Sequence, residues 1–176
     1  NIPSGESFVR QLLVGQQAAR KMFDYTADTL WLPDVFGYSA ALPQILKSAN
    51  VDFFCTTKLG WNDTTRFPYD TFVWKGIDGS SVIAHFNAMP PFLDPKVLTD
   101  HWNIIQHKDV QDRMLASFGH GDGGGGPTGE SIEMVRRCKD LEGCPKAEYM
   151  TTSDYMKSVA KDLNDLPEWS GELYLE

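Results

Sequence analysis

The chain has 176 residues, and its 24 acidic side chains outnumber the 16 Lys and Arg, which gives a formal net charge of −8. This negative balance argues against nucleic acid or an anionic membrane surface as the main partner, and it suits a neutral substrate. Hydrophobic residues make up 41% of the chain, enough for the core of a single domain spanning residues 1–176. No apolar run approaches the length of a membrane span.

The first half of the chain alternates between helical and extended patterns. A helix capped by Ser4 is predicted from apolar residues at helical spacing, namely Phe8, Leu12, Leu13, Ala19 and Phe23. A strand at residues 27–32 leads into a loop that holds Asp34, and Pro43 suits the first turn of the helix that follows. A second strand is predicted at residues 51–56.

The next strands form a hairpin, and the rest of the chain again alternates. Strands at residues 71–75 and 82–86 are joined through Asp78-Gly79, a strong hairpin signal. The later elements are predicted in this order: a helix at 96–107, a strand at 113–118, a Gly-rich loop, a helix from Thr128 to Gly143, a short strand at 147–150, a helix capped by Ser153 or Thr152 that reaches about 163, and a strand at 171–176. The alternation predicts an α/β fold with a mostly parallel sheet, flanking helices and an inserted β-hairpin.

The three cysteines, Cys55, Cys138 and Cys144, are an odd set. Cys55 lies in an apolar extended run and is predicted to be a buried free thiol. Cys138 and Cys144 flank a helix end, but a metal site there would need a second Cys or His pair at ligand spacing. Free thiols favour a reducing compartment, so a cytoplasmic location is expected.

Three polar groups follow three different predicted strands. These are Asp34, Lys58 and Asp122. Because loops after parallel strands share one edge of a sheet, we expect the three to converge there. A lone Asp in such a loop is more often a cap, and a lone Lys is more often solvated, so the placement by itself leaves both interpretations open.

Asp122 lies within a Gly-rich loop at residues 119–127. The glycines allow a ligand to approach the backbone closely. A nucleotide-phosphate loop is excluded because no Lys-Ser/Thr pair follows, and a calcium loop would need further oxygen ligands at fixed steps. A plain flexible loop remains the alternative to a catalytic one.

Several ordered motifs carry a family resemblance. They are 31–39 (WLPDVFGYS), 42–46 (LPQIL), 58–62 (KLGWN), 67–74 (FPYDTFVW), 119–128 (GHGDGGGGPT) and 169–176 (WSGELYLE). Together they resemble the family 38 glycoside hydrolases, which are retaining, zinc-dependent α-mannosidases, and most closely their cytosolic, vacuolar and bacterial branch. The resemblance implies a fragment of the catalytic domain, within a partial seven-stranded α/β barrel, that acts on terminal α-linked mannose in oligosaccharides and N-glycans.

The resemblance also assigns roles to single residues. Asp34 matches the nucleophile, which in this family is also a zinc ligand, and Asp122 matches the general acid/base. A retaining glycosidase needs two such carboxylates about 5–5.5 Å apart. Lys58 matches a basic position beside the nucleophile. Substrate contacts are also expected from Trp61 by stacking, from Asn62 by hydrogen bonding, and from Tyr38.

This sequence matches few of the zinc ligands that the resemblance implies. The family uses two His and two Asp, and only Asp34 matches one of them. The remaining ligands are expected outside this chain, so the chain alone is predicted to bind zinc weakly and to be inactive. His120 is assigned to the acid/base loop, and His85, His101 and His107 are interpreted as ordinary histidines.

Two alternatives remain open from the sequence. One is a metal hydrolase related to polysaccharide deacetylases, which would need no nucleophilic carboxylate. The other is a carbohydrate-binding or structural module without catalysis. The partner expected in the leading interpretation is an α-mannoside, with no nucleic acid and no membrane, and the sequence does not indicate the oligomeric state.

Overall fold

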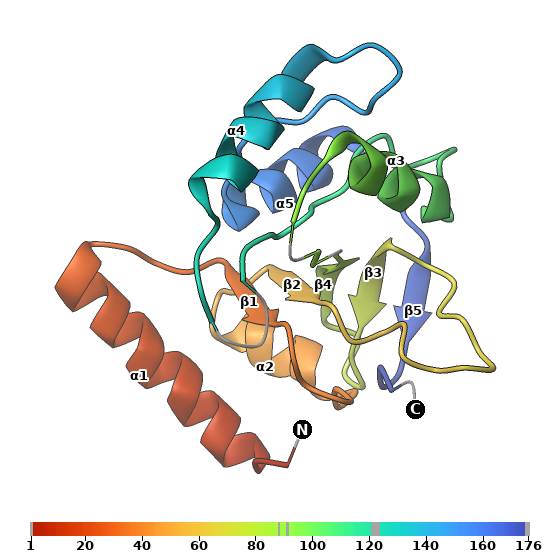
Figure 1. Ribbon diagram of the computed structural model, residues 1–176. Coiled ribbons are helices and arrows are strands. Elements are labelled where there is room, and N and C mark those ends of the chain that lie inside the picture. Colours follow the sequence, from red (N-terminus) through yellow and green to blue (C-terminus); the bar gives the residue numbers. More distant parts are fainter. Residues whose placement is uncertain (1, 88, 91, 121–123, 175–176) are drawn as a thin grey trace.

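The computed structural model of the chain describes residues 2–87, 89–90, 92–120 and 124–174. Over these residues the chain forms one five-stranded sheet with helices on both faces (Figure 1). The strand order is β1-β2-β4-β3-β5. No described helix is long and apolar enough to cross a membrane.

Three of the four strand pairings in the sheet are parallel. β1 (Thr29–Leu32) pairs with β2 (Phe53–Thr56), β2 pairs with β4 (Ser81–Phe86), and β3 (Thr71–Lys75) pairs with β5 (Glu168–Ser170). The exception is β3–β4, which is the antiparallel hairpin expected from Asp78-Gly79. Gly79 has φ +85°, a conformation that its missing Cβ makes inexpensive. The mostly parallel sheet with an inserted hairpin is therefore confirmed.

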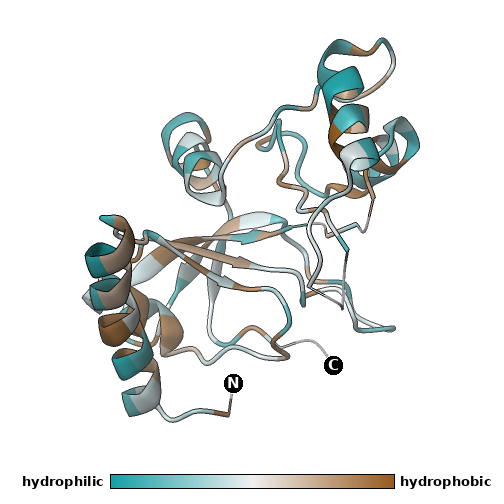
Figure 2. Cartoon of the chain, turned by 60° about the vertical axis from the view of Figure 1, so that its left-hand side comes forward, coloured by the Kyte–Doolittle hydropathy of each residue, from teal (hydrophilic) through white to brown (hydrophobic). Residues whose placement is uncertain are grey.

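One face of the sheet is covered by α1 (Gly5–Phe23) and α2 (Leu42–Ser48). Ser4 caps α1 as predicted, with its hydroxyl oxygen accepting from the Ser7 N–H at 3.3 Å, and Pro43 lies in the first turn of α2. The core on this side is formed mainly by Leu42, Leu46, Phe54, Phe72 and Trp74, with Phe8 and Leu12 of α1 packed against it. Figure 2 shows α1 and α2 together on this side, both with hydrophobic segments.

The opposite face carries α3 (Pro95–Ile104), α4 (Gly129–Arg137) with the short 3₁₀ helix η1 (Cys138–Asp140), and α5 (Thr152–Asp162) (Figure 1). Helix α5 packs Met156 and Val159 against Phe53 and Cys55 of β2. Successive β2 residues alternate between the two faces, and all four are buried. Cys55 is a buried free thiol, as expected, and burial raises its pKa to about 12.

Residues 113–118 form no continuous strand, contrary to the prediction. Only an isolated bridge at Ala116 remains, and two neighbouring backbone groups bond side chains: the Tyr155 hydroxyl lies 3.5 Å from the Arg113 carbonyl, and the Leu115 N–H lies 3.4 Å from Nε2 of His85. Residues 147–150 also hold no strand, because the Ala147 N–H bonds the Cys138 carbonyl of η1 at 3.2 Å.

Three predicted element boundaries in the last third of the chain were also wrong. Helix α4 ends at Arg137 and continues only as η1, well before Gly143. Thr151 caps α5, with its hydroxyl oxygen accepting from the Asp154 N–H at 3.1 Å, where Thr152 or Ser153 was expected. The described part of the strand predicted at 171–176 holds only an isolated bridge at Leu173, and residues 175–176 lie outside the described residues; the nearby strand is β5, which ends at Ser170, and Gly171 follows with φ +113°.

Candidate functional site

The candidate site lies where β1 and β2 end side by side. The two strands are parallel, and Leu32 pairs with Thr56 at their last residues. Asp34 comes two residues after β1 and Lys58 two residues after β2, so both loops leave the same edge of the sheet. Nζ of Lys58 lies 3.1 Å from Oδ1 of Asp34. The expected convergence of these two residues is observed.

The two partners of this ion pair differ sharply in exposure. The Asp34 side chain is 73% exposed, whereas the Lys58 side chain is only 12% exposed. A pair with one partner in water contributes about 0–1 kcal/mol to folding stability. The pair therefore matters for geometry: it presents an open carboxylate toward solvent and holds a cation behind it.

Two aromatic rings line the ammonium of Lys58. Nζ lies 4.3 Å from the ring centroid of Trp61 and 5.4 Å from that of Phe36, and the two rings meet edge to face at 5.8 Å. Trp61 is 66% exposed, so much of its ring remains free for a ligand. The sequence reasoning gave Phe36 no role, although its place two residues after Asp34 in the same loop is a signal that points to it.

A chain of hydroxyl groups joins the ends of the two strands beneath the ion pair. The Lys58 N–H donates to Oγ1 of Thr56 at 3.1 Å, and the Tyr38 hydroxyl donates to the Leu32 carbonyl at 3.1 Å. The Tyr38 and Thr56 hydroxyls also bond to each other. Since the Tyr38 proton is used on Leu32, Thr56 must donate to Tyr38. Each of these hydroxyl groups then has a hydrogen-bond partner, and the backbone before Asp34 and the backbone at Lys58 are fixed relative to each other.

Two further contacts fix the Asp34 loop. The Thr57 hydroxyl donates to the carbonyl of Pro33, directly before Asp34. The Tyr38 backbone exchanges two hydrogen bonds with Leu173, at 2.7 and 3.0 Å. Gly37 makes this approach possible: it has φ +99°, and a Cβ there would lie 2.8 Å from the Tyr174 ring.

Tyr38 and Asn62, both predicted to contact substrate, are engaged in the fold. Tyr38 is 2% exposed, and burial, together with the nearby Asp34 carboxylate, raises the pKa of its hydroxyl. Oδ1 of Asn62 accepts from the N–H groups of Thr64 and Thr65, at 2.9 and 2.6 Å, and closes a turn. Their contacts with a substrate stay predictions.

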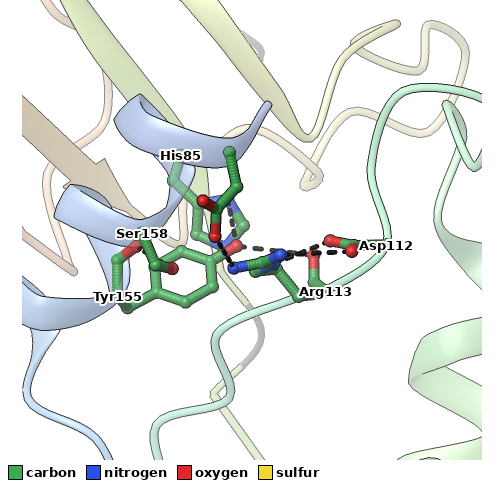
Figure 3. A network of polar contacts seen from close by, with 6 residues as sticks. His85, Asp112, Arg113, Tyr155 and Ser158 are labelled. Carbon is green, nitrogen blue, oxygen red and sulfur yellow. Dashed lines mark hydrogen bonds and ion pairs between the residues drawn. The ribbon is translucent and has the colours of Figure 1, made fainter. Parts of the chain in front are cut away.

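A second polar network, around His85, Arg113 and Tyr155, lies on the α5 face of the sheet (Figure 3). His85 of β4 is buried, with Nδ1 2.9 Å from Oγ1 of Thr71, and burial lowers its pKa to about 3. Arg113 bridges Asp112 and Asp162 at 2.7 and 2.9 Å, which ties the 112–118 segment to α5.

A cavity of about 760 Å³ adjoins this network. Tyr155, Arg113, Trp102 and Tyr149 are among its described lining residues, whereas Asp34 and Lys58 are not. The cavity is therefore not built on the Asp34–Lys58 pair.

The chain matches the family described as Glycosyl hydrolases family 38 N-terminal domain over residues 1–172. It belongs to this family. It is 42% identical to Alpha-mannosidase G of Dictyostelium discoideum, 38% to Alpha-mannosidase of Saccharomyces cerevisiae and 37% to Alpha-mannosidase 2C1 of Homo sapiens. Each alignment covers the whole chain but only 16–17% of the relative.

A solved structure of similar fold is that of an alpha-mannosidase from Enterococcus faecalis V583. It superposes on 97% of this chain with a TM-score of 0.69 at 20% identity, and the match covers 20% of that protein. At that identity the likeness supports the fold, which agrees with a family 38 N-terminal domain.

The predicted acid/base residue of this family 38 chain, Asp122, lies outside the described residues. Among the described residues beside it, the Gly125 N–H bonds the His120 carbonyl at 3.1 Å, and Gly124 has φ +66°. His120 is exposed. The distance between the two carboxylates, and so their pairing, stays a prediction.

The described part of the chain does not by itself fit a zinc ion. It contains no group of three or more His, Cys, Asp or Glu side chains placed to hold a metal. The one predicted ligand, Asp34, has its Oδ1 3.1 Å from the ammonium of Lys58, a cation that would repel a metal ion at that oxygen. A catalytic zinc takes at least three protein ligands.

Proposed function

We propose that the protein carrying this chain hydrolyses α-linked mannosides with retention of configuration, with Asp34 as the nucleophile. The observation that carries the proposal is the exposed Asp34 carboxylate, paired with Lys58 at the carboxyl edge of two parallel strands, in a chain of family 38. This edge is where open α/β folds place their chemistry. The relatives' names, all alpha-mannosidases, support the sugar.

In the first step an Asp34 oxygen attacks the anomeric carbon of the mannoside. The bond from that carbon to the leaving oxygen breaks, its electron pair stays on the oxygen, and the oxygen takes a proton from Asp122. The product is a glycosyl ester of Asp34 together with a free alcohol. Asp34 suits this step because its side chain is open to solvent while its loop is held by Tyr38 and Thr57.

In the second step Asp122 takes a proton from water, and the resulting hydroxide attacks the same carbon and releases Asp34. Two inversions leave the product in the substrate's configuration. Lys58, which donates toward Asp34, has two further N–H groups for sugar hydroxyls. The exposed ring of Trp61 suits stacking on a sugar face, and the Asn62 amide N–H groups suit hydrogen bonding.

A zinc ion is proposed only for the whole protein that carries this chain. Bound there, it would supply positive charge that grips sugar hydroxyls, with Asp34 as one ligand and at least two more from outside the described residues. The steps above use the two carboxylates alone. A cytoplasmic location is supported by the free cysteines Cys55, Cys138 and Cys144.

The test is turnover of an aryl α-mannoside by the protein carrying the substitution Asp34→Asn. This near-isosteric change removes the nucleophile, and we expect kcat to fall by about 10³-fold or more with an unchanged circular dichroism spectrum. Asp63→Asn, a change of an exposed Asp in the next loop, is the matched control. Ordinary turnover by Asp34→Asn, or first-formed β-mannose seen by NMR, would overturn the proposal.

A further inference from the structure

We propose that Trp61 is a positioning residue, which holds the Lys58 ammonium against its ring face so that the cation stays beside Asp34. This role is distinct from stacking on a sugar, because Trp61 acts here through Lys58. The inference rests on the proposed function, since the nucleophile gives the held cation its purpose. Its structural part can be tested without any turnover.

The geometry is that of a cation between two aromatic rings. Nζ of Lys58 lies 4.3 Å from the Trp61 centroid and 5.4 Å from the Phe36 centroid, both within the roughly 6 Å range of cation–π attraction. Trp provides the strongest such face among the aromatic side chains. The edge-to-face contact between Phe36 and Trp61, at 5.8 Å and 86°, sets the two rings at an angle around the ammonium.

Burial shows that the arrangement is unusual within this chain. Lys58 is 12% exposed, whereas the other ion-paired lysines among the described residues are 39–82% exposed. An ammonium withdrawn from water needs compensation. A single carboxylate oxygen at 3.1 Å gives part of it, and that carboxylate is itself mostly in water. The faces of the Trp61 and Phe36 rings add to it.

The arrangement restricts a side chain that is otherwise very mobile. Lysine has a flexible four-carbon stem, and an exposed ion pair rarely holds it in one position. Here the rings of Phe36 and Trp61 and the carboxylate of Asp34 all lie near the ammonium. The cation is thereby fixed before a ligand arrives, and the remaining Asp34 oxygen stays available to a ligand.

The first experiment measures the Lys58 ε-methylene proton shift by NMR in this chain. Ring currents should move the Lys58 signal upfield of the signals of the other lysines. The signal that disappears in Lys58→Arg is thereby assigned to Lys58. Trp61→Leu should return it more than halfway to the position of the other lysines, whereas Trp61→Phe, which keeps a ring, should retain most of the shift. Tyr25→Leu, a change of an exposed ring elsewhere, is the matched control. A Lys58 signal already among the other lysines, or one unmoved in Trp61→Leu, overturns the proposal.

The second experiment separates positioning from stacking in the mannosidase. Losing the cation–π contact should lower kcat by about two- to thirtyfold in Trp61→Leu, and Trp61→Phe should restore most of it. A rise in KM alone would show that Trp61 only contacts the sugar, and this overturns the positioning role. If the proposed function is wrong, the result differs: Asp34→Asn keeps full activity, whatever the NMR shift of Lys58.

Discussion

Replacing Tyr38 with Phe tests the hydroxyl chain that joins the two loops of the site. The change removes one oxygen from a side chain that is 2% exposed. The Leu32 carbonyl loses its donor and the Thr56 hydroxyl loses its acceptor. The ring and its edge-to-face contact with Phe54 remain, so the change isolates the hydrogen bonds.

The magnitude follows from two buried partners left without a bond. A net hydrogen bond contributes about 1 kcal/mol, and an orphaned buried group costs about 1–3 kcal/mol, so we expect Tyr38→Phe to lower the free energy of unfolding by about 2 kcal/mol. For a chain of this length that corresponds to a fall in Tm of about 4–8 °C. Urea unfolding followed by circular dichroism measures both the midpoint and the slope.

Three results would refute this reasoning. Tyr38→Phe could lie within about 0.5 kcal/mol of the wild type, which is the change expected for the exposed control Tyr25→Phe. A double-mutant cycle with Thr56→Val could show no coupling, although direct partners should couple by about 0.5–3 kcal/mol. The third is a raised KM with unchanged stability, which would support the predicted substrate contact of Tyr38 over its role in the fold.

Three further predictions follow from the described contacts. Gly37→Ala should lower the free energy of unfolding in urea by about 3 kcal/mol, and Gly79→Ala should lower it by about 1 kcal/mol. Both glycines have positive φ, but only at Gly37 would the new Cβ overlap a side chain. Equal losses of stability in the two variants would contradict this. Because burial lowers the pKa of His85 to about 3, the unfolded state binds the proton first, so stability should fall as pH drops below about 6.5, by up to about 1.4 kcal/mol per unit. That slope should be lost in His85→Gln and kept in His107→Gln. Zinc calorimetry on this chain should give binding weaker than about micromolar; tighter binding would mean missed ligands, with His120 the first to substitute.

Most of the sheet could be predicted from the sequence because its signals are local. Asp78-Gly79 specifies a hairpin because this dipeptide suits a tight turn. Pro43 marks a helix start because it lacks the N–H that would be unpaired there, and Ser4 marks one because its hydroxyl oxygen accepts from a backbone N–H of the first turn. The meeting of Asp34 and Lys58 could also be predicted, since parallel neighbours bring their following loops to one edge.

The remaining features depend on contacts between distant segments. Residues 113–118 have an extended pattern, but their backbone bonds the side chains of His85 and Tyr155 on other elements. Tyr38 is buried because Gly37 allows its backbone to bond Leu173, about 135 residues later. Neither the hydrophobic pattern nor the residue spacing of a sequence shows which distant side chain will hydrogen-bond a backbone group.

Asp34 is proposed as the nucleophile of a retaining α-mannosidase. The most direct test treats the active protein with a fluorinated mannosyl fluoride that forms the glycosyl-enzyme quickly and hydrolyses it slowly, followed by peptide mass spectrometry. If Asp34 is the nucleophile, one fluorinated mannosyl adduct is expected on the peptide that contains Asp34, and none in Asp34→Asn. An adduct on any other carboxylate, or complete turnover without an adduct, would contradict it.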